Sequence, residues 1–203
     1  MRRALASLTD VETAHPDLEI DLAIDLSIAL GQQSDYAEAE ALLIRSEESL
    51  QAALGPARTY RLARARSLTL LYAGDVLGAL EQGERALAAA ERTGDEHRRA
   101  AALLHLAQAE NRLHDYASAL DRLRRVLEIE QRPLHRAIAL LETGICQLEL
   151  NRLDQAHTTF ERALELAREL GHDRLEGVLL GELGLVEAKR GRSEAAIALF
   201  DRA

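Results

Sequence analysis

A spacing that recurs five times constrains this chain more than any other feature. Similar segments contain an alanine near their start at Ala39, Ala79, Ala119, Ala156 and Ala196, so the steps between them are 40, 40, 37 and 40 residues. A period of this size is typical of stacked helical hairpins, because one hairpin cannot bury its apolar face without a neighbour of the same kind. The sequence therefore predicts a helical-repeat architecture that acts by binding, although it does not identify the ligand.

The clearest copy of the repeating unit is the run 151–171, NRLDQAHTTFERALELARELG. Ala156, Phe160 and Ala163 fall at helical spacing and form one apolar face, together with Leu164 and Leu166. Gly171 suits a left-handed residue that ends the helix. The unit therefore predicts a turn, one amphipathic helix and a stop.

The composition supports an all-α protein. The 203 residues are 47% hydrophobic and 29% charged, which is typical of a folded chain, and only 3% are aromatic. Alanine and leucine dominate, and both are strong helix formers. We expect a single domain over residues 1–203, made of an N-terminal helix at 3–13 and hairpins at 18–53, 57–93, 96–130, 134–170 and 173–203.

Individual residues refine this prediction. Asp17 is expected to cap the first helix of the hairpin 18–53, whose second helix is expected to run to Ala53. Small residues are expected where paired helices cross, at Ser27, Ser67, Ala107, Gly144 and Gly184. Gly177 and Gly181 lie within the same predicted helix as Gly184, and we expect them to permit close packing as well.

Charge and cysteine content exclude several classes of partner. The net charge of −9 argues against a general nucleic-acid or anionic-membrane surface, since phosphate contacts need a basic face. Arg61, Arg64 and Arg66 form a local basic patch, which we interpret as a solvated or salt-bridged helix face. The single cysteine, Cys146, is expected to be a partly buried, inert thiol and excludes an internal disulfide. With neither a signal sequence nor a membrane-spanning run, the sequence favours a cytoplasmic location.

The pattern of small and aromatic residues resembles the tetratricopeptide repeat family. The strongest copies are Leu180, Leu183, Gly184, Gly191, Ala196, Phe200 and Ala203, and the earlier set Leu140, Gly144, Ala156, Phe160 and Ala163. The period of about 40 residues is similar to that of the long-repeat variant found in kinesin light chains and in bacterial signalling and transcription regulators. This resemblance implies a right-handed α-α superhelix of about five hairpins with a concave binding face.

The same resemblance places candidate binding residues on the first helix of each hairpin. The candidate groove is formed by Arg61, Arg64, Leu68, Tyr72, Leu104, Gln108, Asn111, Arg112, Leu141, Ile145 and Glu149, and the first hairpin adds Asp21, Ile24 and Ile28. At the positions where the chaperone-binding branch of the family holds a peptide's carboxylate, Arg64 is the one basic residue, so that clamp is not expected here. The groove is instead apolar and would suit a peptide or an amphipathic partner helix. The alternative is that the long helices bury these leucines against their own neighbours.

Three functional hypotheses follow from these observations. The first is a protein-interaction module that binds a protein or peptide in the groove. The second is a sensor region of a larger bacterial regulator, since the chain resembles an excerpt of a longer protein and has end helices suited to self-association. The third, an enzyme, is disfavoured because the sequence has no nucleotide-binding, nucleophile-elbow or HExxH motif. We therefore expect no catalytic residues, no metal and no cofactor.

Overall fold

The computed structural model describes residues 15–203, so the helix predicted at residues 3–13 lies outside the described range. Every regular element within that range is helical, which confirms the prediction of an all-α fold. The helices are α2 (Pro16–Gln32), α3 (Tyr36–Ser49), the short 3-10 helix η1 (Gln51–Ala53), α4 (Pro56–Ala73), α5 (Val76–Thr93), α6 (Glu96–Arg112), α7 (Tyr116–Ile129), α8 (Pro133–Glu149), α9 (Leu153–Glu169), α10 (Asp173–Lys189) and α11 (Ser193–Phe200).

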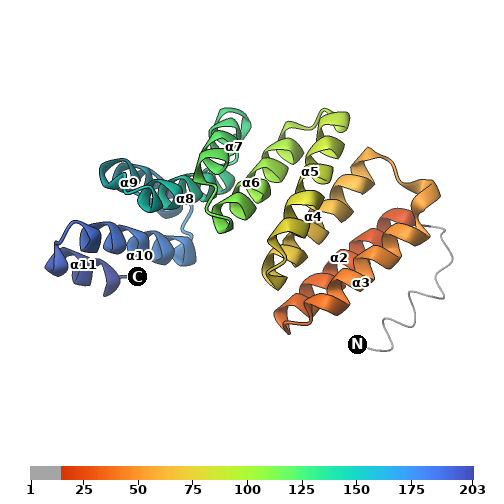
Figure 1. Cartoon of the computed structure of the whole chain (residues 1–203), viewed down its shortest axis with the longest axis horizontal. Coiled ribbons are helices and arrows are strands. Elements are labelled where there is room, and N and C mark those ends of the chain that lie inside the picture. The colour runs from red at the N-terminus through yellow and green to blue at the C-terminus, as the bar shows by residue number, and fades with distance from the viewer. Residues whose placement is uncertain (1–14) are drawn as a thin grey trace. The chain divides into compact units, whose positions relative to one another are not determined.

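The helices pack in sequential pairs, as the 40-residue period predicts. Helices α2 and α3, and then α4 and α5, form neighbouring hairpins, as Figure 1 shows. Helices α8 with α9 and α10 with α11 repeat this arrangement further along the chain. The hairpin of α6 and α7 contains an ion pair between Glu110 and Arg122 at 2.6 Å.

The chain divides into two compact units, and the boundary falls inside α6. The first unit extends to His105 and contains α2 to α5, whereas the second is Leu106–Ala203 and contains α7 to α11. Each unit has its own apolar core. Leu43 and Leu50 are fully buried in a cluster of the first unit, and Phe160 and Leu179 in a cluster of the second. The single-domain assignment stays a prediction.

Local sequence signals explain most helix boundaries. Pro16, Pro56 and Pro133 occupy the first turn of α2, α4 and α8, where the missing N–H of proline is harmless. Asp75 and Asp115 each accept a hydrogen bond from a backbone N–H at the start of the next helix. Gly171 has a φ of +61°, which confirms the predicted left-handed residue after α9.

Two boundary predictions for the first hairpin are wrong. Asp17 lies in the first turn of α2 and makes no cap; its carboxylate binds Arg58 at 2.9 Å instead. Helix α3 ends at Ser49 rather than at Ala53. Leu50 follows this helix with its side chain buried, and Gln51–Ala53 forms a 3-10 turn that leads into extended backbone before Pro56, where proline disfavours helix in the residue before it.

The helix crossings show why small residues recur at one repeat position. A Cβ atom added to Gly144 would lie 2.3 Å from Cε1 of Phe160, and one added to Gly184 would lie 2.6 Å from Cε1 of Phe200. These glycines therefore make room for an aromatic ring, as predicted. Gly181 differs, because an added Cβ would meet no atom within 4 Å. The close-packing prediction for Gly181 is therefore wrong.

Arginine–carboxylate contacts connect the hairpins within each unit. In the first unit, Arg66 of α4 binds Glu40 at 2.7 Å and Glu47 at 2.9 Å, both on α3. Arg85 of α5 also binds Glu47. Although burial raises the pKa of Glu47, hydrogen bonds from Arg85 and Arg66 and their charges outweigh it, and the pKa lies below its usual value. The predicted salt-bridged face is thus confirmed for Arg66.

Candidate functional site

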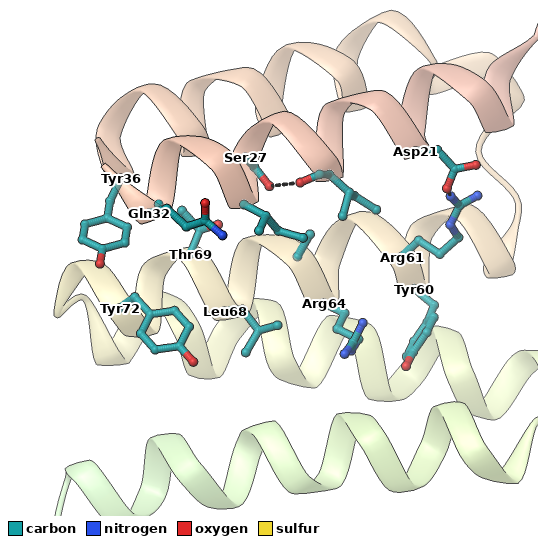
Figure 2. A pocket seen from close by; sticks show the side chains of 14 residues that line it. Asp21, Ser27, Gln32, Tyr36, Tyr60, Arg61, Arg64, Leu68, Thr69 and Tyr72 are labelled. Carbon is teal, nitrogen blue, oxygen red and sulfur yellow. Dashed lines mark hydrogen bonds and ion pairs between the residues drawn. The ribbon is translucent and has the colours of Figure 1, made fainter. Parts of the chain in front are cut away.

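A groove of about 490 Å³ lies in the first unit, between α2 and α4, with the start of α3 at one end. Six of its lining residues come from α2, one from α3 and seven from α4. Figure 2 shows the labelled side chains of α2 and the start of α3 above α4, and Tyr60, Arg64, Leu68 and Tyr72 side by side along α4. The lining residues are Asp21, Ile24, Ser27, Ile28, Gly31, Gln32, Tyr36, Tyr60, Arg61, Arg64, Ala65, Leu68, Thr69 and Tyr72.

The central part of the groove is apolar. Ile24 and Ile28 lie one turn apart on α2, and Leu68 belongs to the lining contributed by α4. Ile28 is 56% exposed, so its side chain is available to a ligand. Tyr36 and Tyr72 lie together at one end of the groove (Figure 2), and Tyr72 is 62% exposed. A ligand in this part would bury hydrocarbon and meet phenol hydroxyls at one end.

The opposite end of the groove is charged. Figure 2 shows Asp21 of α2 beside Arg61 of α4, and the two side chains form an ion pair. Arg61 also lies 3.5 Å from Asp17. The hydrogen bond from Arg58 holds the pKa of Asp17 below its usual value, and the charges of Arg58 and Arg61 act in the same direction. The carboxylates of α2 therefore neutralise the first arginines of α4.

Arg64 lies between the apolar and the charged parts. Its Nε donates a hydrogen bond to Nε2 of His105 at 3.1 Å. Since arginine is always a donor, this contact requires Nε2 of His105 to be unprotonated. The nearby Tyr60 is buried, and the guanidinium of Arg98 lies 5.6 Å from the centre of its ring. Arg64 therefore lies beside a neutral histidine rather than a carboxylate.

Seven of the predicted groove residues meet in this one site: Asp21, Ile24, Ile28, Arg61, Arg64, Leu68 and Tyr72. The lining residues that the sequence did not predict are Tyr36 of α3 and, from α2 and α4, Ser27, Gly31, Gln32, Tyr60, Ala65 and Thr69. Tyr36 follows Asp35 at the start of a second helix, in the turn pattern that also gives Asp115-Tyr116. The predicted groove contains residues of first helices alone, whereas Tyr36 begins the second helix of its hairpin.

The other predicted residues do not line this groove. Leu104 is 4% exposed, so for this residue the alternative of a packed core leucine is correct. Leu141 and Ile145 are partly buried against the core cluster of the second unit. Arg112 is exposed at the end of α6.

Polar candidates of the second unit gather around carboxylates. Gln108 and Asn111 donate hydrogen bonds to Glu142 at 2.9 and 3.3 Å. Glu149 lies 3.9 Å from Lys189. Burial raises the pKa of Glu182, and the charges of Glu142 and Glu149 raise it further. These groups form an acidic face that lies outside the groove of the first unit.

Chemistry of other kinds has little support in the described part of the chain. Cys146 is fully buried, and burial first, with the charges of Glu142 and Glu110, raises the pKa of its thiol to about 12. Over residues 15–203 no group of three or more acidic, histidine or cysteine side chains is arranged to hold a metal ion. Within the same range no helix has the length and apolar character that crossing a bilayer requires.

The paired helices and the groove between α2 and α4 define a helical-repeat protein with one candidate binding site in the first unit. The sequence comparison then identifies the family. Residues 98–169 and 135–203 match the tetratricopeptide repeat, and together these matches cover more than half of the chain. The chain belongs to the tetratricopeptide repeat family, as predicted. Repeats of this family typically mediate protein interactions and are generally non-catalytic.

Solved structures show the same fold at low sequence identity. BtubC (BKLC) from P. vanneervenii is 21% identical over 99% of this chain and 85% of its own, with a TM-score of 0.82. A Rap protein in complex with Competence and Sporulation Factor is 16% identical over 97% of this chain and 55% of its own, with a TM-score of 0.82. Repeats of a putative kinesin light chain from P. anserina are 20% identical over 94% and 95%, with a TM-score of 0.72. No curated protein sequence matches the chain significantly.

Proposed function

We propose that the groove between α2 and α4 binds an apolar peptide or a partner helix. The observation that carries this proposal is the exposure of Ile28 on α2 and Tyr72 on α4, at 56% and 62%, along one concave space of about 490 Å³. Ligand sites of proteins commonly have volumes of about 300–1,000 Å³ and are mainly apolar. Exposed apolar surface in a concave site marks an interaction more often than isolated surface leucines do.

Family membership and one structural neighbour support the same interpretation. Tetratricopeptide repeats bind protein partners, and the similar Rap structure holds Competence and Sporulation Factor. A groove between first helices offers two walls whose side chains repeat at helical spacing, which suits an inserted peptide or helix. The groove would serve equally in a free interaction module and in the sensor region of a larger regulator, because both act through a bound ligand.

The proposal is tested with exposed groove residues, so that loss of binding does not reflect loss of folding. Peptides of about 12 residues, which is roughly three helical turns, are selected from a random library against the whole chain, and their affinity is measured by fluorescence anisotropy. Ile28→Ser and Tyr72→Ala should each weaken binding about tenfold or more, since each removes a buried contact in the complex. Leu77→Ser is the matched control, because Leu77 is 71% exposed and lies outside the groove.

Circular dichroism distinguishes the possible results. All three variants should keep the helical spectrum of the parent chain. If the selected peptides bind Ile28→Ser and Tyr72→Ala as tightly as they bind the parent, the groove is not the binding site. Peptides that bind the groove should also compete with one another for the chain. A selection in which no two peptides compete would count against the proposal.

A second candidate function is self-association through α11, and one comparison between repeats favours it. Phe160 of α9 is fully buried, whereas Phe200 at the same position of α11 is 44% exposed and the neighbouring Ile197 is 59% exposed. We propose that this apolar face binds a second copy of the chain. Light scattering over a range of concentrations should show a dimer or larger species that Ile197→Ser weakens. A monomer at every concentration would contradict it.

A further inference from the structure

The arginines of α4 are not equivalent, and their difference indicates what the groove recognises. Helix α4 contains Arg58, Arg61, Arg64 and Arg66. Arg58 binds Asp17, Arg61 binds Asp17 and Asp21, and Arg66 binds Glu40 and Glu47. Within the described residues Arg64 is the member of this set that has no carboxylate partner. It is also the member that lies beside the apolar centre of the groove.

The geometry leaves one side of the Arg64 guanidinium available. Its Nε is engaged by His105, while neither Nη atom has a hydrogen-bond or ion-pair partner among residues 15–203. The two Nη groups together form a planar donor edge suited to the two oxygens of a carboxylate. His105 accepts the Nε hydrogen bond and thereby holds the guanidinium in place. A charged donor edge is thus fixed within the groove lining.

The spacing along α4 gives the order of contacts. Arg64, Leu68 and Tyr72 follow one another at intervals of four residues and all line the groove, and Figure 2 shows their side chains in that order along one side of α4. Four residues of a helix span about 6 Å. A ligand that lies along α4 would therefore meet a positive charge, then an apolar contact about 6 Å further, then an aromatic ring.

We propose that the groove selects a peptide segment with an acidic side chain at Arg64 and apolar side chains toward Leu68 and Tyr72. This inference rests on the proposed function, because it names the partner of the same groove. In a helical ligand the acidic residue would be followed, or preceded, by apolar residues at about one and two turns. The acidic group is a side chain rather than a chain terminus, because the groove lining continues on both sides of Arg64, to Arg61 and to Tyr72.

The charge pattern of the groove supports this choice of partner. Asp21 is already paired with Arg61, so a basic ligand group would have to compete for it. An acidic ligand group needs to displace only water from the Nη atoms of Arg64. A carboxylate placed there would make charge-assisted hydrogen bonds in a partly enclosed site, where they are stronger than in open solvent.

The test is a positional-scanning library of acetylated peptides of about 12 residues, made both as C-terminal amides and as free acids, and assayed against the whole chain. We expect Asp or Glu to be preferred at one internal position and Leu, Ile or Phe about four residues away. Arg64→Gln should reduce affinity for the preferred peptides about tenfold, the size expected for one charged hydrogen-bonded contact. It should also abolish the acidic preference.

A charge exchange and a matched control make the result specific. Arg64→Glu should invert the preference, so that Lys or Arg is selected at the same internal position. Arg45→Gln should change nothing, because Arg45 is exposed on α3, outside the groove, and its Nε donates only to the Ala41 carbonyl of its own helix. Circular dichroism of each variant reports whether the helices are retained.

The outcomes separate this inference from the proposed function. Peptides that bind, depend on Ile28 and Tyr72, and show no acidic preference would overturn the role of Arg64 but leave the groove as a binding site. A preference that requires the free-acid library would assign Arg64 to a terminal carboxylate and overturn the internal side-chain assignment. Binding that is insensitive to Ile28→Ser and Tyr72→Ala would overturn both proposals.

Discussion

Two glycines of the second unit, Gly144 and Gly181, have opposite surroundings although both lie inside helices. Gly144 on α8 faces the ring of Phe160, which is fully buried. Gly181 on α10 faces open space. The surroundings of each glycine therefore decide how an added methyl group changes stability. The sequence does not distinguish the two glycines, because the atoms that surround them belong to another helix.

This contrast predicts a change of sign between two identical substitutions. Gly144→Ala places a Cβ where Phe160 now lies, and overpacking of this kind costs about 1–3 kcal/mol of unfolding free energy. Gly181→Ala meets no atom and gains helix propensity, which stabilises by roughly 0.5–1 kcal/mol. Urea unfolding followed by circular dichroism measures both changes. Equal effects of the two substitutions would mean that Phe160 is free to move aside.

At the scale of the element, the connection between α7 and α8 depends on one carboxylate. Glu130 has no exposed surface, and its side chain accepts hydrogen bonds from the backbone N–H, Nε and Nη2 of Arg132 at 2.9, 3.0 and 2.7 Å. Nη1 of Arg136 donates to its carbonyl at 2.9 Å. The repeat step falls to 37 residues here because α7 has 14 residues, whereas α5 and α9 have 18 and 17. The Glu130 carboxylate and the two arginines fix the three-residue connection that follows this shorter helix.

The anchor makes the second unit sensitive to acid. Burial raises the pKa of Glu130, but the hydrogen bonds and charge of Arg132 outweigh it and lower the pKa from 4.5 to about 2. A lowered pKa in the folded state means that the stabilisation is present above pH 4.5 and is lost as the pH falls toward 2. Its size is on the order of 3 kcal/mol, from the size of the pKa change.

Glu130→Gln should therefore unfold at lower urea concentration than the parent at pH 7, and the difference should shrink progressively below pH 4.5. Urea titrations at several pH values between 7 and 2 test this prediction. Glu128→Gln is a suitable control, because Glu128 is an exposed carboxylate of the same helical segment. A difference between Glu130→Gln and the parent that is independent of pH would show that packing, not charge, anchors the connection.

The positions of the helices can be predicted from this sequence, whereas the contacts between helices largely cannot. The alanine period and the turn residues located each described hairpin to within a few residues, because helical periodicity and helix stops are local signals. The sequence does not predict the end of α3 at Ser49, because the 3-10 turn at Gln51–Ala53 continues a helix-like stretch of good helix formers. Ile24 and Leu104 share one repeat register, two steps of 40 residues apart, yet the first lines a groove and the second is core. That difference depends on the neighbouring helices, which a single repeat does not encode.

At the scale of the whole molecule, each compact unit has its own apolar core, and the hairpins contact mainly their neighbours in sequence. In such an array stability is approximately the sum of the stabilities of the repeats and of the interfaces between adjacent repeats. Loss of one hairpin should therefore remove its own contribution and one interface. It should not abolish folding of the rest.

A chain shortened to residues 1–171 tests this expectation. It lacks α10 and α11, so Ala163 and Ala167 lose the cover that Leu175, Leu179 and Leu183 provide in the core cluster of the second unit. The shortened chain should keep α2 to α9, lose helical signal in proportion to the residues removed, and melt several degrees lower, since each kcal/mol shifts the melting temperature by roughly 2–8 °C.

Because the groove between α2 and α4 is formed entirely by α2, α3 and α4, the shortened chain should also bind the selected peptides with unchanged affinity. A random-coil spectrum at room temperature would contradict the additive picture and show that folding of the first unit requires the last hairpin. A folded chain with weakened peptide affinity would instead contradict the confinement of the binding site to the first unit.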